Sequence, residues 1–290
     1  SKGKQKQLVM NLKNILLAAI AFVALVSTAD AQTKENSFQI EKIGNGKQNI
    51  LFIPGFASSG EVWKETIDAL GNDYTYYVLT MAGFASVPAQ TDPSFKGWRD
   101  DIIDYIKSEK ILNPIIIGHS MGGVMAMDIA ATEPTLISKI VVVDALPCLA
   151  ALSDPNYKSK PNIDCSAIVN QMNSITDEQF KAMQKQVMTG MVQDTSKQQI
   201  ILDWTMKSDR STFGKMFCDF SNTDLREEIK SIQCPTLILL ESSFKQIKPA
   251  IEQQYVNLRS ADFRYAENSL HFIMYDAKDW YLQQVQNFLK

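Results

Sequence analysis

The sequence has 290 residues, and 45% of them are hydrophobic, which is enough chain to form one α/β domain with an insertion, or at most two domains. The formal net charge is only −3 and no basic face recurs along the chain, so we expect no nucleic-acid partner.

The first 31 residues have the pattern of a secretory signal rather than of a folded element. Lys13 supplies a basic start, residues 15–26 form an apolar run, and Ala29-Asp30-Ala31 fits the small-x-small cleavage rule. The apolar run is shorter than the roughly 20 residues that span a bilayer. Met10 is a natural initiator for such a signal, so residues 1–9 are interpreted either as an upstream extension or as residues added to the natural protein. We therefore predict export to the periplasm or the medium, with a mature form that has no stable membrane span; a retained anchor is the alternative.

Strands and helices alternate along most of the remaining chain. This order favours the α/β class, with a mainly parallel twisted sheet and helices on both of its faces. The expected strands are residues 37–43, 49–53, 75–80, 115–118, 139–144, 235–240 and 262–266. The expected helices are residues 61–70, a segment in which Trp98, Ile102 and Ile106 recur at four-residue spacing, and residues 121–132, 249–258 and 277–289.

Residues 147–220 interrupt this alternation, because they contain helical patterns but no strong strand. We predict that they form a helical cap over the carboxyl edge of the sheet, with the α/β core made of residues 32–146 and 221–290. Thr176 with Gln179 and Ser196 with Gln199 fit the capping-box pattern at the start of two helices.

The cap is rich in methionine and has an apolar stripe formed by Phe180, Met183, Val187 and Met191. Flexible methionine side chains suit two roles, and we favour packing in the cap's own interior over lining a pliable apolar pocket.

The four cysteines allow two pairings in an oxidising compartment. Cys148 and Cys165 lie in one loop-rich segment and are one candidate disulfide. Cys218 and Cys234 are either a second pair or two buried thiols, and Cys234 is favoured as a small buried hydrophobic residue because it directly precedes a core strand.

Residues 115–123, Ile-Ile-Ile-Gly-His-Ser-Met-Gly-Gly, have the strongest chemical pattern in the chain. A β-branched run stops at Gly118 and an apolar helix follows at once, so Ser120 lies at the apex of a sharp turn. In the pattern Gly-x-Ser-x-Gly, side chains at Gly118 or Gly122 collide with the neighbouring strand or helix. We therefore predict a nucleophile elbow that exposes the hydroxyl of Ser120.

A serine nucleophile needs a base, and the chain has only two histidines. His119 is adjacent to Ser120 and its side chain is expected to point away from the hydroxyl, in a packing role. His271, in the loop after the last strand, is the predicted base.

Three segments together resemble the α/β-hydrolase superfamily, in particular its capped serine esterase-like members. They are Pro54-Gly55-Phe56, residues 118–123, and His271-Phe272, in this order and separation. The resemblance covers essentially all of the chain after the signal. It implies the α/β-hydrolase fold, the chain order serine, acid, histidine, and an oxyanion hole formed by the backbone N–H groups of Phe56 and Met121.

The sequence departs from the family pattern at two points. Pro54-Gly55 replaces a common His-Gly, which leaves the backbone donor of Phe56 intact. Many relatives also carry an aspartate a few residues after the strand that here ends at Leu240, but residues 241–245 contain none. Asp144, at the end of the strand after the nucleophile's strand, is the favoured acid over Glu241; its alternative role is to cap the following turn.

These residues predict a serine hydrolase that cleaves a small-molecule carboxylic ester, or a related acyl substrate, through an acyl-enzyme. No metal or organic cofactor is needed, and two histidines leave little room for a His-rich metal site. Amidase, thioesterase or aminopeptidase activity with the same triad is one alternative. A catalytically silent binding module on the same scaffold is another.

Overall fold

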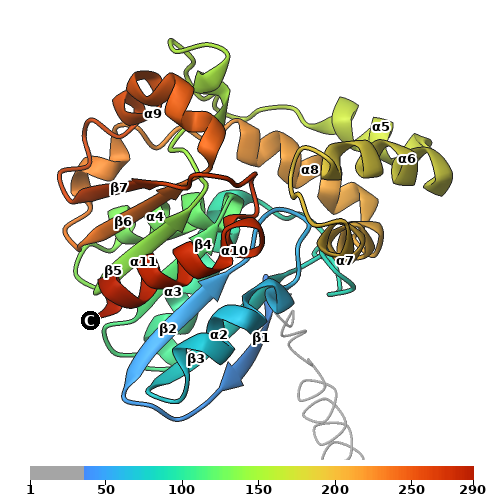
Figure 1. The fold of residues 1–290 in the computed structure, drawn as a ribbon. Coiled ribbons are helices and arrows are strands. Elements are labelled where there is room, and N and C mark those ends of the chain that lie inside the picture. The colour runs from blue at the N-terminus through green and yellow to red at the C-terminus, as the bar shows by residue number, and fades with distance from the viewer. Residues whose placement is uncertain (1–35) are drawn as a thin grey trace, which may run out of the picture. The chain divides into compact units, whose positions relative to one another are not determined.

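A seven-stranded sheet forms the centre of the computed structural model, which describes residues 36–290 (Figure 1). The predicted signal segment lies outside the described residues. The strand order is β1-β3-β2-β4-β5-β6-β7, and only β1 is antiparallel to its neighbour. The strands are β1 (Phe38–Ile43), β2 (Gln48–Ile53), β3 (Tyr74–Met81), β4 (Ile115–His119), β5 (Lys139–Val143), β6 (Thr236–Leu240) and β7 (Ala261–Tyr265).

The central strands are short continuous runs of Ile, Val and Leu because both of their faces are covered. All five residues of β4 are buried, and in the β4–β5 register Gly118 pairs with Val142. All parallel strands end at the same edge of the sheet, so the segments after β2, β4, β5, β6 and β7 meet there. The predicted mainly parallel sheet with helices on both faces is confirmed.

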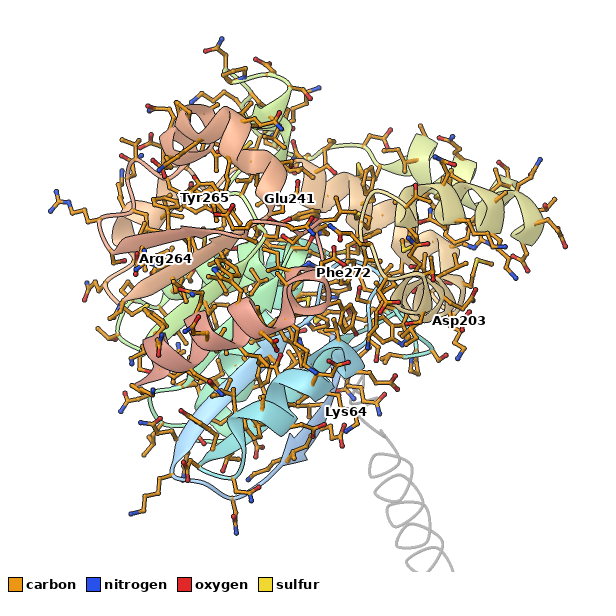
Figure 2. The ribbon with its side chains drawn as sticks, in the orientation of Figure 1. Lys64, Asp203, Glu241, Arg264, Tyr265 and Phe272 are labelled. Atoms are coloured by element: carbon orange, nitrogen blue, oxygen red, sulfur yellow. A yellow bond between two sulfur atoms is a disulfide. The ribbon has the colours of Figure 1, made fainter. Side chains whose placement is uncertain are left out.

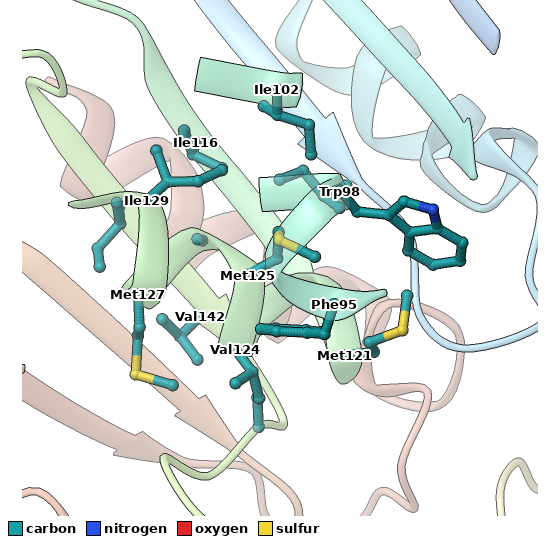
Figure 3. Close-up of a cluster of buried hydrophobic side chains, with 14 of the residues drawn as sticks. Phe95, Trp98, Ile102, Ile116, Met121, Val124, Met125, Met127, Ile129 and Val142 are labelled. Atoms are coloured by element: carbon teal, nitrogen blue, oxygen red, sulfur yellow. The ribbon is translucent and has the colours of Figure 1, made fainter. Parts of the chain in front are cut away.

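Helices cover the two faces of the sheet and form two separate apolar clusters. One face packs against α3 (Phe95–Ser108), α4 (Met121–Thr132) and α9 (Lys248–Gln254), and Figure 3 shows the part of this cluster around Trp98, Met125 and Val142. The other face packs against α2 (Lys64–Leu70) and α11 (Lys278–Leu289). Shorter elements are the 3-10 turns η1 (Gly60–Trp63), η2 (Leu149–Leu152), η3 (Glu228–Ser231) and η4 (Ser242–Ile247), and the helix α10 (Ile273–Asp276).

Four helices between β5 and β6 lie beyond one edge of the sheet, at the right of Figure 1. They are α5 (Ser166–Ser174), α6 (Asp177–Met188), α7 (Thr195–Met206) and α8 (Arg210–Ser221), called the cap helices below. Among the described residues, no helix combines the length and the apolar character that a bilayer crossing requires.

One of the two predicted capping boxes is present in the cap helices. Thr176 Oγ1 accepts a hydrogen bond from the Gln179 N–H at 3.2 Å, and Gln179 Oε1 accepts one from the Thr176 N–H at 2.9 Å. The box predicted at Ser196 is wrong, since the N-cap of α7 is Asp194, two residues earlier, whose Oδ1 accepts from the Ser196 N–H at 2.8 Å. The ionised carboxylate is a better N-terminal acceptor than a serine hydroxyl in the first turn.

The cysteine pairing expected from sequence proximity is wrong. Cys165 forms a disulfide with Cys218, not with Cys148, and the bond joins the N-terminus of α5 to α8. The packing of α5 on α8 brings the Cα atoms of Cys165 and Cys218 to 5.7 Å, within the range for a disulfide. Cys148 is a buried thiol after β5, and Cys234 is a buried thiol before β6, as expected for the latter.

Candidate active site

Ser120 connects β4 directly to α4 in a backbone conformation that L-residues rarely adopt, with φ 53° and ψ −122°. The flanking glycines make this turn possible. A Cβ atom on Gly118 would lie 2.1 Å from the backbone oxygen of Gly122, and one on Gly122 would lie 2.2 Å from that of Ile53. Any side chain at these two positions would therefore collide with backbone, as the Gly-x-Ser-x-Gly pattern predicts. The turn presents Ser120 at the carboxyl edge of the sheet.

Asp144 lies one residue beyond β5 and is almost completely buried, with 3% of its surface exposed. Its Oδ2 lies 2.6 Å from Nδ1 of His271, and its Oδ1 accepts a hydrogen bond from the backbone N–H of Glu241 at 2.7 Å. Both carboxylate oxygens are thus engaged, one by the imidazole and one by a fixed backbone donor. The role of a turn cap and the role of a partner to His271 coexist in the same side chain.

Glu241, the other candidate acid, follows β6 at the same edge of the sheet, where Figure 2 labels it. Burial, and then the negative charge of Asp144, raise the pKa of its carboxyl group. The hydroxyl of Ser243 donates a hydrogen bond to this carboxylate. Within residues 36–290 the Glu241 side chain makes no hydrogen bond to His271, so the structure brings Asp144, and not Glu241, to the imidazole.

The loop after β2 lies directly against the elbow. A Cβ on Gly55 would lie 2.9 Å from Nδ1 of His119 and 3.2 Å from Cβ of Ser120, so only glycine allows this approach. The next residue is Phe56, and the residue after the elbow serine is Met121. In the described part of the chain, neither backbone N–H donates a hydrogen bond to another protein group, which leaves both donors free for a substrate oxygen.

His119 does more than pack. Its Nε2 lies 3.0 Å from the backbone oxygen of His271, and the two imidazole rings are 4.6 Å apart. Only the tautomer with a proton on Nε2 can donate to that carbonyl, which leaves Nδ1 as a buried acceptor without a partner among the described residues. Burial, and then the neighbouring His271, hold the pKa of His119 well below its usual range. A neutral His119 therefore fixes the backbone that carries the predicted base.

In the His119→Gln variant, the free energy of unfolding is expected to fall less steeply at acidic pH than in the wild type. Because the folded-state pKa of His119 is depressed, its contribution is present above the unfolded value of about 6.5 and is lost as pH falls below it, by at most about 1.4 kcal/mol per pH unit. Glutamine can donate the same hydrogen bond but does not titrate. Urea unfolding between neutral and acidic pH measures the difference, and parallel curves for wild type and variant would contradict this role.

The loop that carries His271 is also attached to the cap. Asp276 accepts hydrogen bonds from the Leu270 N–H and from the Gln193 N–H of the α6–α7 loop, both at 2.9 Å. The Phe272 N–H donates to the backbone oxygen of Met191 at 3.0 Å. The position of the imidazole thus depends on the cap as well as on the sheet, which no local sequence pattern indicated.

Two cavities open at Ser120. The cap cavity, of about 400 Å³, extends under the cap helices, and the acid-side cavity, of about 330 Å³, extends past Asp144 and Glu241. Both are lined by Ser120 and His271, and Phe56, Met191 and Phe217 also border both. Such volumes lie at the lower end of the range for small-molecule sites.

Four of the six methionines in residues 147–220 form much of the wall of the cap cavity, whereas Met206 and Met216 have the favoured packing role in the apolar interior. The four are Met172, Met183, Met188 and Met191. Met172 and Met188 are buried, whereas Met183 is 41% exposed because α6 packs only one of its sides on its neighbours. Among residues 36–290, no group of three or more His, Cys, Asp or Glu side chains is arranged to hold a metal ion.

Comparisons with known proteins agree with this architecture. Residues 50–284 match the model of the Alpha/beta hydrolase family. The pimeloyl-(acyl-carrier protein) methyl ester esterase of Vibrio atlanticus (strain LGP32) is 28% identical over 200 residues, which cover 66% of this chain and 74% of that protein.

Two solved structures share the fold at low sequence identity. The enol-lactonase from Burkholderia xenovorans LB400 superimposes with a TM-score of 0.72 at 14% identity, over 87% of this chain and 96% of that one. An esterase from Exiguobacterium antarcticum gives a TM-score of 0.70 at 17% identity, over 87% and 94%. Since the family model spans well over half of the sequence, the chain belongs to the alpha/beta hydrolase family.

Proposed function

We propose that this protein is an exported serine hydrolase that cleaves carboxylic esters through an acyl-enzyme, with Ser120 as nucleophile, His271 as base and Asp144 as acid. The observation that carries the proposal is the 2.6 Å contact between His271 Nδ1 and the buried Asp144 Oδ2, at the edge where the elbow presents Ser120. A carboxylate in this position fixes the imidazole tautomer and stabilises the imidazolium.

The reaction proceeds in two acyl-transfer steps. Ser120 Oγ attacks the ester carbonyl while His271 Nε2 takes its proton, and the backbone N–H groups of Phe56 and Met121 hold the developing oxyanion. Each such donor is worth about 3 kcal/mol in the transition state. The tetrahedral intermediate collapses, and the alcohol leaves with the proton from His271. In the second step water attacks the acyl-enzyme while His271 takes its proton, and the acid leaves as Ser120 regains its proton from His271.

Esters are favoured over other acyl compounds by the names of similar proteins, which are a methyl ester esterase, an enol-lactonase and an esterase. The proposed export depends on residues 1–31 of the sequence, and the proposed core and cap boundaries at residues 147 and 220 depend on the change of pattern there. The substrate class that follows is a small neutral ester able to enter the apolar cap cavity.

A fluorophosphonate probe tests the nucleophile directly. We expect covalent labelling of the folded wild-type protein at Ser120, and complete loss of labelling in Ser120→Ala. Ser221, at the end of α8, lines neither cavity and its buried hydroxyl has no partner among the described residues, so Ser221→Ala is the matched control and keeps the label. Mass spectrometry of the labelled peptide identifies the site. Folded wild-type protein that is not labelled would contradict the proposal and favour a silent binding module.

A further inference from the structure

The cap helices contribute three polar side chains to the wall of the largely apolar cap cavity, and two of them are buried, whereas the third, Gln171, is exposed. Gln184 of α6 is 6% exposed and Thr205 of α7 is 3% exposed, and both border the cavity. Within the described residues, neither the amide of Gln184 nor the hydroxyl of Thr205 forms a hydrogen bond with another protein group. Phe180, Gln184 and Met188 share the buried face of α6, so the amide points inward with its apolar neighbours.

The polar atoms of Gln184 and Thr205 keep some accessible surface, since neither side chain is among the fully buried polar groups without a partner, and this surface faces the cavity. A polar group at an apolar wall is costly, because it has fewer hydrogen-bond partners there than in bulk water. An apolar residue at either position would pack in the same cap without that cost. Two such groups, from two different helices and facing one cavity, therefore indicate a hydrogen-bonding partner that enters from outside the protein.

The side chains that line the cap cavity restrict the charge of the ligand group that can bind there. The lining contains no Lys, Arg, Asp or Glu, and His119 is held neutral by burial, so no charge is available to balance an ionised ligand group. A glutamine amide and a threonine hydroxyl can each donate and accept. They suit an uncharged hydroxyl or oxo group better than a carboxylate or an ammonium group.

The two cavities also differ in the catalytic groups that line them. Phe56 and His271 border both cavities, but the rest of the oxyanion loop (residues 55–58) lines only the cap cavity, and Asp144 and Glu241 line only the acid-side cavity. The acyl carbonyl must face the oxyanion donors, and the leaving alcohol must face the acid–base pair. This arrangement assigns the acyl half of the ester to the cap cavity.

We propose that the cap cavity binds an acyl chain that is apolar apart from one uncharged hydroxyl or oxo group, and that Gln184 and Thr205 recognise this group. The inference rests on the proposed ester hydrolysis and names the substrate class of the same site. A pocket built to hydrogen-bond a substrate group discriminates strongly against the analogue that lacks it, since its polar groups are then left unpaired.

The test uses p-nitrophenyl esters of one straight-chain acid and of its hydroxy and oxo derivatives, with the substituent moved carbon by carbon along the chain. We expect kcat/KM of the wild type for the best-placed derivative to exceed that for the plain ester by at least about tenfold. Gln184→Leu and Thr205→Val should each reduce this ratio towards one. Gln186→Leu, an exposed glutamine on the same helix, is the matched control and keeps the wild-type ratio.

Three outcomes decide the matter. Equal kcat/KM for plain and substituted esters at every position would overturn the proposed recognition, as would a preference that Gln184→Leu and Thr205→Val leave intact. A preference that appears only when the substituent is on the alcohol half would overturn the assignment of the acyl half. Loss of the ester hydrolysis itself is detected separately, because Ser120→Ala and the fluorophosphonate label report on the nucleophile and not on the cavity wall.

Discussion

Asp144→Asn is expected to lower kcat for ester hydrolysis by about 10⁴-fold while the protein remains folded. The reason lies in the two partners of the carboxylate. The backbone N–H of Glu241 is fixed and needs an acceptor, so the amide oxygen of the asparagine takes the place of Asp144 Oδ1. The amide NH₂ then faces His271 Nδ1, which must accept. The proton of the neutral imidazole moves to Nε2, and His271 can no longer take a proton from Ser120.

Glu241→Gln is the matched control at the other candidate acid, and we expect it to keep kcat within about tenfold of the wild type. Its side chain lacks a hydrogen bond to His271 in the described structure, and its backbone N–H remains in the variant to hold Asp144. Kinetics at saturating ester, with thermal unfolding as a check on folding, measure both variants. If Asp144→Asn retains wild-type turnover while Glu241→Gln loses several orders of magnitude, Glu241 is the acid and our assignment is wrong.

The features that could be predicted from the sequence are those that depend on short stretches of chain. The continuous Ile and Val runs of β4 and β5 indicate strands that are buried on both faces, whatever their neighbours in the sheet. The spacing of Gly118, Ser120 and Gly122 is likewise a local steric requirement of the turn. The resemblance to the alpha/beta hydrolases is confirmed by the family match over residues 50–284. Asp144 was favoured over Glu241 from its position after β5 alone, and the structure brings it to His271.

The features that could not be predicted depend on contacts between distant segments. The partner of Cys165 is set by how α5 packs on α8, and sequence proximity offered Cys148 only as a candidate. The hydrogen bond from His119 to the backbone of His271 joins residues 152 positions apart, and no pattern near either residue indicates it. Four methionines of the cap line a cavity next to Ser120, and helical periodicity alone does not specify which apolar face meets that cavity.

Gly122→Ala is expected to damage both stability and catalysis, because its Cβ would enter space already filled by backbone. The atom would lie 2.2 Å from the backbone oxygen of Ile53 and 2.6 Å from that of Pro54. Neither oxygen belongs to a flexible side chain, so the end of β2 must shift. We expect a loss of about 3 kcal/mol in the free energy of unfolding, at the upper end for over-packing, and a fall in melting temperature of about 6–12 °C.

The same shift should lower kcat/KM of the protein that remains folded, because the displaced segment leads into Phe56, whose N–H is a proposed oxyanion donor. A donor moved out of reach costs about 10²-fold in kcat. Gly190→Ala is the control for stability, since its Cβ would meet only the Val187 backbone oxygen, at an ordinary 3.7 Å. The wild type is the reference for kcat/KM, because Gly190 lines the acid-side cavity. Calorimetry and steady-state kinetics on both variants separate the effects. A Gly122→Ala protein that melts like Gly190→Ala and turns over like the wild type would show that the elbow and the β2 loop are not packed as tightly as the proposed oxyanion hole requires.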